Sequence, residues 1–172
     1  MLYIIFIGDS LTQWFDWEGR FPMHRVMNLG ISGETVEGLL ARRDHIRSDV
    51  VNPDLIFLMT GINNIVNGQN NILPPYRKLI SDLTTWYRKS KIIIESILPV
   101  ELAWISNNVI KDVNCGLMDM ASEYNTEYLD LYTIFMDATG KPIRGYLSDD
   151  GVHLANRGYK AWSNAIEPYL KR

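Results

Sequence analysis

The sequence contains few of the residues on which thiol and metal chemistry depend. It has one cysteine, Cys115, and three histidines among 172 residues. A single cysteine cannot form an internal disulfide, and no cysteine pair completes a zinc site with the histidines. We therefore expect no metal and no cofactor. We interpret Cys115 as a buried core residue, because we place it on the apolar side of an expected helix.

The chain also lacks a basic excess and a long apolar run. Seventeen Lys and Arg against 20 Asp and Glu give a formal charge of -3, which argues against nucleic-acid binding. The apolar run at residues 2–7 is far shorter than the ~20 residues that span a bilayer, and Gly8 and Asp9 interrupt it before it resembles a secretory signal. The sequence predicts a cytoplasmic protein without membrane insertion or a nucleic-acid partner, and it leaves the oligomeric state open.

Two kinds of apolar segment alternate along the chain. Short runs with strand-like composition occur at residues 2–7, 26–29, 55–59, 92–98 and, more weakly, 128–131. Segments with helical spacing follow them at residues 35–46, 76–87, 109–124 and 156–170. Strands joined by helices run parallel. We predict a three-layer α/β/α sandwich around a five-stranded parallel sheet, flavodoxin-like in class. Because no repeat or linker divides the chain, residues 1–172 are expected to form a single domain.

Glycine and small polar residues follow the first three expected strands. In open parallel sheets, functional groups gather beyond the carboxyl ends of the strands. The three segments are Gly8-Asp9-Ser10-Leu11, Gly30-Ile31-Ser32-Gly33-Glu34-Thr35 and Thr60-Gly61-Ile62-Asn63-Asn64. We expect all three at the same edge of the sheet.

Only one histidine is expected to reach that edge. His24 precedes the second strand and lies at the opposite end, and His45 stands in a charged stretch typical of a solvated helix face. His153 follows the fifth strand, and Asp150 precedes it by three residues with Gly151 between. A tight turn can bring this carboxylate onto one ring nitrogen, as in the base half of a catalytic triad. A turn that only caps the last helix is the alternative.

Ser10 is the best candidate nucleophile, because it directly follows the first strand and Gly8 permits a tight turn there. A helix N-cap is its alternative role, and the two roles are compatible. Ser32 competes, but its segment lacks the final glycine of a Gly-x-Ser-x-Gly elbow. The backbone amides of Ser10 and Gly33 and the side-chain amide of Asn63 are candidate donors to an oxyanion.

These segments resemble the motifs of the SGNH, or GDSL, hydrolase family. The match lies in Gly8-Asp9-Ser10-Leu11, Asn28-Leu29-Gly30-Ile31-Ser32-Gly33, Gly61-Ile62-Asn63-Asn64 and Asp150-Gly151-Val152-His153, which occur in family order across almost the whole chain. The resemblance implies a Ser-His-Asp esterase in which Ser10 is the nucleophile, His153 the base and Asp150 its partner. It also implies an oxyanion hole formed by Ser10, Gly33 and Asn63.

Two positions depart from the commonest family pattern: Asn64 replaces the usual Asp, and Leu154 replaces the Pro that often follows the histidine. Both are similar to the branch that contains platelet-activating-factor acetylhydrolase catalytic subunits and some carbohydrate acetylesterases. The resemblance implies a small-molecule ester substrate with a short acyl group, particularly acetyl. Lysophospholipase or thioesterase activity is the alternative within the family.

Candidate substrate contacts are Asp9, Trp14 and Trp104, which follow the first and fourth strands. Packing in the core or at the rim is the alternative for the aromatic segments that contain them. Short loops in a chain of this length predict an open cleft without a large lid. A rival of another class is a flavodoxin-like module that binds a flavin or another phosphate at residues 8–12. However, the chain lacks Gly-x-Gly-x-x-Gly and a P-loop, and Asp9 would place negative charge beside the phosphate.

Overall fold

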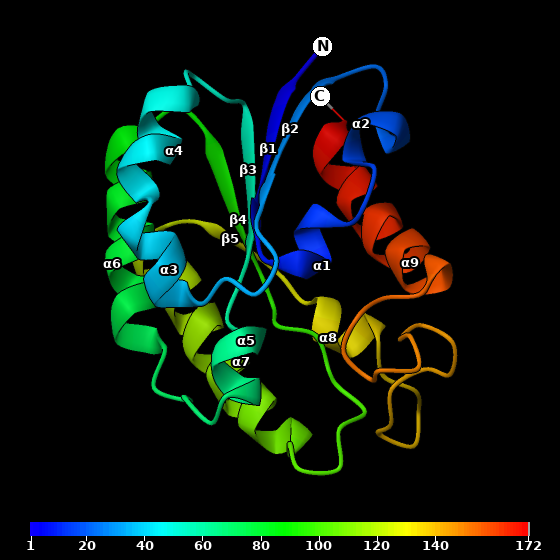
Figure 1. The fold of residues 1–172 in the computed structure, drawn as a ribbon. Coiled ribbons are helices and arrows are strands. Elements are labelled where there is room, and N and C mark those ends of the chain that lie inside the picture. Colours follow the sequence, from blue (N-terminus) through cyan, green and yellow to red (C-terminus); the bar gives the residue numbers. More distant parts are fainter. Residues whose placement is uncertain (172) are drawn as a thin grey trace.

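All five expected strands form and pair side by side in one parallel sheet. The computed structural model describes residues 1–171 (Figure 1). The strands are β1 (Tyr3–Gly8), β2 (Arg25–Gly30), β3 (Leu55–Met59), β4 (Lys91–Glu95) and β5 (Glu127–Leu129), in the order β2-β1-β3-β4-β5. In this order the chain moves from β1 to one side and then returns to the other, so the strand order reverses at β1.

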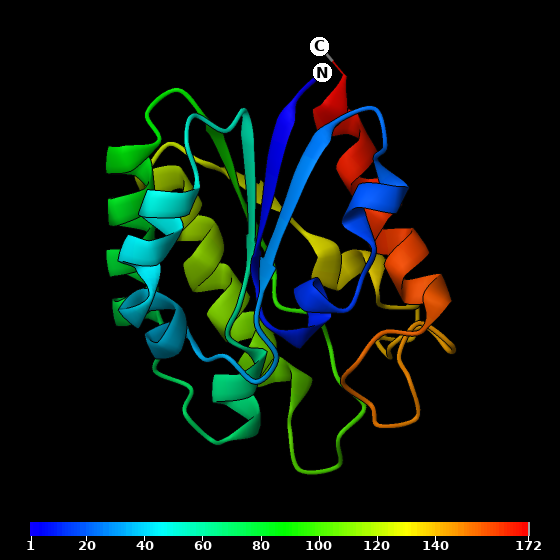
Figure 2. The ribbon, with the colours of Figure 1, turned by 45° about the horizontal axis from the view of Figure 1, so that its top comes forward.

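Helices cover both faces of the sheet, which confirms the predicted three-layer sandwich (Figures 1 and 2). One face carries α3 (Val36–Ala41), α4 (Arg43–Asp49), α6 (Leu73–Trp86) and α7 (Asn107–Glu123). The other carries α1 (Ser10–Gln13), α2 (Trp17–Arg20) and α9 (Asn156–Ile166), which continues as the 3-10 turn η1 (Glu167–Leu170). Two short helices, α5 (Ile62–Val66) and α8 (Leu131–Ile134), lie toward the carboxyl ends of the strands. No helix within residues 1–171 is both long enough and apolar enough to cross a bilayer.

Several expected boundaries were wrong. The helix expected at residues 35–46 is two helices, because Thr35 is the N-cap of α3 and the backbone bends at Arg42 before α4 begins. The strand expected at residues 92–98 ends at Glu95, although residues 96–98 remain buried. The strand expected at residues 128–131 ends at Leu129, because the Asp130 side chain caps α8.

The interpretation of Cys115 as a core residue was also wrong, because its thiol is exposed. The buried side of α7 consists of Ile110, Val113, Leu117 and Met120 among others. A helix turns by about 100° per residue. Cys115 stands two positions from both Val113 and Leu117, so it faces away from the apolar stripe.

The central strands β1 and β3 are buried on both faces, and aromatic rings fill the layer between the sheet and α9. All six residues of β1 are buried. Phe6 of β1 stacks on Trp17 with ring centroids 4.0 Å apart, and Trp17 meets Trp162 of α9 edge-on at 4.9 Å. This packing fixes the loop between β1 and β2 against the sheet, and that loop carries Ser10.

Candidate active site

Ser10 lies beyond the carboxyl end of β1, where the strand order reverses. Gly8 allows the tight turn there, because a Cβ at this position would lie 2.2 Å from the Thr12 Oγ1 and 2.3 Å from the Met59 carbonyl oxygen. Asp9 is the N-cap of α1, so Ser10 is the first helical residue and not the cap itself. Only 5% of Ser10 is exposed.

Side chains from three other elements brace the single turn of α1. The Asn28 side-chain amide donates to the carbonyl oxygens of Thr12 at 3.0 Å and Gln13 at 3.2 Å. The Trp17 indole also donates to the Thr12 oxygen, at 2.9 Å, and the Tyr159 hydroxyl donates to the Leu11 oxygen at 3.1 Å. A one-turn helix leaves its carbonyl groups without partners inside the helix. These donors therefore fix the helix that carries Ser10.

His153 connects Ser10 with Asp150. The Ser10 Oγ lies 2.9 Å from the His153 Nε2, and the His153 Nδ1 lies 2.6 Å from the Asp150 Oδ2. When Nδ1 carries the proton and donates to the carboxylate, Nε2 is left to accept the Ser10 hydroxyl proton. The expected turn is confirmed: Gly151 has a φ of +73°, and Asp150 Oδ1 accepts both the Val152 and His153 backbone amides at 2.9 Å.

The environment of Asp150 favours its ionised form. Partial burial acts to raise the pKa of this carboxyl, but the two backbone hydrogen bonds and the contact with His153 outweigh it and hold the pKa below its usual value. The loop is braced from behind, because the Glu101 amide donates to the Gly151 oxygen at 2.7 Å. A carboxylate is thus held against the imidazole by local turn geometry and by the loop after β4.

Trp14 covers His153. The two rings stack with centroids 4.1 Å apart and planes 17° from parallel, and 58% of Trp14 is exposed. The Trp14 indole nitrogen donates to the Ser32 Oγ at 2.9 Å, and Ser32 in turn donates to the Gln13 side chain. Ser32 is therefore engaged with α1 and its following turn, and the structure brings Ser10, not Ser32, to the histidine.

The three candidate oxyanion donors lie on adjacent elements. Within residues 1–171 the backbone amides of Ser10 and Gly33 make no hydrogen bond, and Gly33 is exposed with a φ of +76°. The Asn63 side-chain amide donates to the Glu34 carbonyl oxygen at 2.9 Å. An amide nitrogen carries two hydrogens, so this contact orients Asn63 and leaves one hydrogen for another acceptor.

Two of the three predicted substrate contacts, Asp9 and Trp104, do not stack on His153 as Trp14 does. Asp9 is only 1% exposed, and its Oδ1 accepts the Leu11 amide at 3.0 Å, so it cannot meet a substrate directly. Burial raises its pKa to about 7. Trp104 is 70% exposed in the loop after β4 and makes no ring contact within residues 1–171.

The other two histidines lie where the sequence places them. His24 is at the amino end of the sheet, where its Nδ1 accepts the Leu2 amide at 3.2 Å, and His45 is exposed on α4. Within residues 1–171 no group of three His, Cys, Asp or Glu side chains is arranged to hold a metal ion.

Asn64 supports the start of α3, a role that the sequence did not predict. In the sequence it was noted only because it replaces the usual Asp of the family motif. It is fully buried in α5, its Oδ1 accepts the Val36 amide at 2.9 Å, and its Nδ2 donates to Glu37 Oε2 at 2.7 Å. These contacts fix the start of α3 against α5. They also place the segment between Gly33 and Val36 beside Asn63.

Comparisons with known proteins point in one direction. A family model described as the GDSL-like Lipase/Acylhydrolase family matches residues 6–161. The platelet-activating factor acetylhydrolase IB subunit alpha2 of Rattus norvegicus is 26% identical over 165 residues, which cover 91% of this chain and 70% of that protein.

Solved structures agree with this. A Streptococcus pneumonia protein provisionally described as a platelet activating factor has a TM-score of 0.88 at 28% identity, with 98% of this chain and 83% of that chain covered. Axe2, an acetylxylan esterase from Geobacillus stearothermophilus, has a TM-score of 0.81 at 20% identity, with 99% and 94% covered. At that identity the likeness to Axe2 is one of fold.

Proposed function

Because the chain belongs to the GDSL-like lipase/acylhydrolase family, we propose that it is a serine esterase that removes short acyl groups through a Ser10-His153-Asp150 triad. The observation that carries the proposal is the continuous contact from the Ser10 Oγ through both imidazole nitrogens to the Asp150 carboxylate, at 2.9 and 2.6 Å. A structural turn would need neither the orientation of Nε2 toward a serine nor the burial of that serine.

The geometry supports a two-step reaction. His153 Nε2 takes the Ser10 hydroxyl proton as Oγ attacks the ester carbonyl carbon, and Asp150 stabilises the imidazolium that forms. The carbonyl oxygen becomes an anion held by the Ser10 and Gly33 amides and the free hydrogen of Asn63. When the intermediate collapses, the bond to the alcohol breaks and His153 returns the proton to the leaving alcohol. Water then attacks the acyl-enzyme with His153 again as base, which releases the acid and restores Ser10.

An acetyl group is the acyl part that we favour. One relative is named an acetylhydrolase, and a protein of the same fold is named an acetylxylan esterase. In this chain Trp14 lies against the imidazole, and the Ser10 side chain is nearly covered. Both features leave little room for a long acyl chain beside the nucleophile.

The proposal is tested with p-nitrophenyl acetate and an organophosphonate label. We expect the wild type to hydrolyse the ester and Ser10→Ala to lose activity while keeping its fold, and we expect mass spectrometry to find the label on Ser10. Ser32→Ala is the matched control and should retain most of its activity, because the Ser32 Oγ contacts Trp14 and Gln13 and not the histidine. Activity that survives in Ser10→Ala, or label found on Ser32, would overturn the assignment.

A further inference from the structure

An open hollow of about 680 Å³ lies between the start of α3 and the loop after α5. We call it the amide hollow, because four side-chain amides line it together with one hydroxyl and one carboxylate: Asn67, Gln69, Asn70, Asn71, Thr35 and Glu37. The side-chain amides of Asn67, Gln69, Asn70 and Asn71 are exposed and make no hydrogen bond within residues 1–171. Each offers a donor and an acceptor to a ligand.

Both walls of the hollow continue directly from proposed oxyanion donors. Thr35 follows Gly33 by two residues, and Asn67 follows Asn63 by one helical turn. The backbone amide of Asn67 donates to the Asn63 carbonyl oxygen at 3.2 Å. Four residues of helix advance by about 6 Å. The hollow thus begins about one helical turn from the proposed contact with the ester carbonyl oxygen. Because the proposed acyl group is short, only the group attached to the alcohol oxygen is long enough to extend from Asn63 to the hollow.

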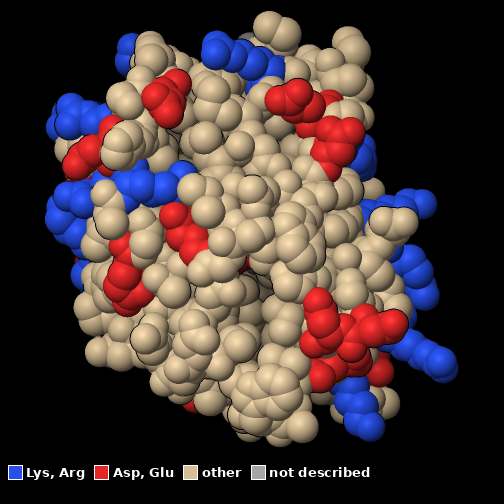
Figure 3. All heavy atoms as spheres, in the orientation of Figure 1, with Lys and Arg blue, Asp and Glu red and all other residues tan. Residues whose placement is uncertain are grey.

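The charge of the hollow restricts what that group can be. Glu37 is the one charged residue among those that line it, and no Lys, Arg or His is present there. Figure 3 shows the surface over α5 and the loop below it without a Lys or Arg side chain. A phosphate would find no cation in this hollow and would lie close to a carboxylate. Neutral hydroxyl groups, by contrast, match amides that can both donate and accept.

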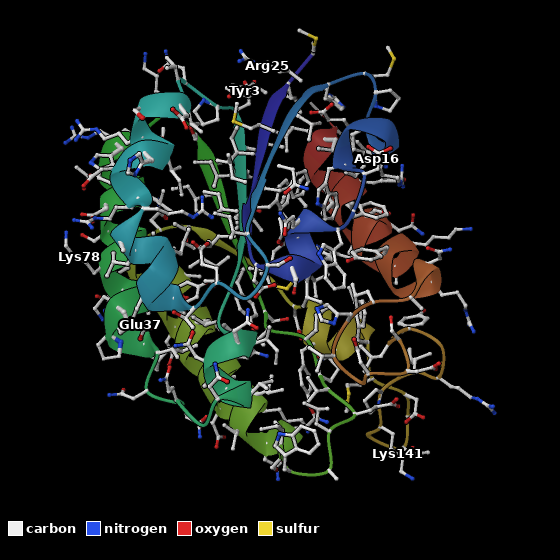
Figure 4. All side chains as sticks on the ribbon, viewed as in Figure 1. Tyr3, Asp16, Arg25, Glu37, Lys78 and Lys141 are labelled. Carbon is white, nitrogen blue, oxygen red and sulfur yellow. The ribbon has the colours of Figure 1, made fainter. Side chains whose placement is uncertain are left out.

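Asn64 holds Glu37 in place at the end of α3 that faces α5 (Figure 4). The hydrogen bond from Asn64 and the other local contacts lower the pKa of Glu37, so the carboxylate remains an acceptor at neutral pH. An aspartate at position 64 would repel Glu37 and lose this donor. The arrangement of the hollow thus depends on a residue that departs from the usual family pattern.

We propose that the amide hollow binds the alcohol half of the ester, and that this alcohol is a neutral polyhydroxy group of the carbohydrate type. The inference rests on the proposed esterase function. It assigns the acetylated sugar, and not the phospholipid, as the substrate class, although the relatives include proteins named for platelet-activating factor.

The test compares two substrates on each variant: acetylated xylo-oligosaccharides, which would fill the hollow, and p-nitrophenyl acetate. In Gln69→Ala/Asn70→Ala we expect the ratio of kcat/KM for the oligosaccharide to that for p-nitrophenyl acetate to fall about ten-fold, the effect of two or so lost neutral hydrogen bonds. Asn164→Ala removes an exposed amide from α9, on the opposite face of the sheet, and should leave this ratio unchanged. Thermal unfolding of all variants shows whether the fold is intact.

Three results would overturn the inference. The first is an unchanged ratio in the folded double variant. The second is wild-type preference for an acetylated glycerophosphocholine in vesicles over the oligosaccharide. The third is a preference for acetylcholine that Glu37→Gln abolishes, because it would assign the hollow to a cationic alcohol.

Titration of Ser10→Ala with the acetylated oligosaccharide measures binding without turnover. Adding Gln69→Ala/Asn70→Ala to this variant should weaken the binding. Hydrolysis of p-nitrophenyl acetate distinguishes the two proposals. If the wild type does not hydrolyse it, the esterase proposal is wrong; if it does, the three results above refute only the carbohydrate inference.

Discussion

Replacing Glu95 with glutamine should change how the stability of the protein responds to pH. Glu95 ends β4, is fully buried, and accepts a hydrogen bond from the Trp162 indole at 2.7 Å. Burial disfavours the charged carboxylate and raises its pKa from 4.5 to about 8, and the Trp162 contact offsets only part of this. Glutamine has nearly the same shape, keeps an oxygen for Trp162 and cannot ionise.

The sign of the effect follows from where each state loses its proton. The unfolded chain releases the Glu95 proton near pH 4.5, whereas the folded protein retains it up to about pH 8. Between these values the unfolded state binds fewer protons, so the free energy of unfolding falls as pH rises. The slope is about 1.4 kcal/mol per pH unit, which gives a loss of about 3 kcal/mol between pH 5.5 and 8. Glu95→Gln should escape this loss.

Urea unfolding of both proteins at pH 5.5, 6, 7 and 8 measures the effect. The stability of Glu95→Gln relative to the wild type should rise by about 3 kcal/mol across this range. Asp9 is also buried with a raised pKa, but it is present in both proteins and cancels in the difference. Glu37→Gln is the matched control: the lowered pKa of Glu37 leaves it ionised throughout the range, so its difference from the wild type should stay flat. A difference for Glu95→Gln that does not vary with pH would refute the reasoning.

Three further substitutions test the parts that position the proposed triad. Asn28→Ala removes the donor to the last carbonyls of α1 and should lower both kcat and the free energy of unfolding, the latter by about 1 to 3 kcal/mol in urea titrations; unchanged values would show that α1 needs no such brace. Gly151→Ala puts a Cβ 2.7 Å from the Glu101 backbone oxygen, at a residue with a positive φ. Calorimetry should therefore find a free energy of unfolding lower by more than about 1 kcal/mol, and kcat should fall as well. A variant as stable as the wild type would contradict this. Asp150→Asn keeps an acceptor for the backbone amides but removes the charge beside His153. The kcat for p-nitrophenyl acetate should therefore fall about 10³- to 10⁴-fold, with little change in melting temperature. Near-normal turnover would argue against the proposed triad.

The sequence predicted the parallel sheet and the meeting of Ser10 with His153 because both follow from rules with little freedom. Alternating apolar segments determine parallel strands, and parallel strands bring the segments that follow them to one edge. The contact between Asp150 and His153 is local, since a three-residue turn with glycine needs no information from elsewhere in the fold. These parts depend on spacing alone.

The supporting contacts could not be predicted in this way. Asn28 reaches the carbonyls of α1 from β2, and the Tyr159 hydroxyl reaches Leu11 across 148 residues of sequence. Such contacts depend on side-chain rotamers and on how closely helices pack, which periodicity does not report. Trp14 and Trp17 illustrate the same limit: they stand three residues apart in one aromatic segment, yet Trp17 is buried against Phe6 and Trp14 lies open over His153.

The two helical layers contribute different halves of the candidate site. Ser10, the proposed nucleophile, belongs to α1, and the loop that carries His153 leads into α9, so both depend on the layer that α9 and the aromatic rings build. Asn63 and the amide hollow belong to the segments around α5 and α3. Strand order reverses at β1, between these two sides, and a crevice is expected at such a point. A substrate that bridges this crevice would place its acyl group beside α1 and His153, and its alcohol beside α3 and α5. Substitutions in the loop after α5 should therefore change which ester is chosen, whereas substitutions behind α1 should change how fast any ester is cleaved.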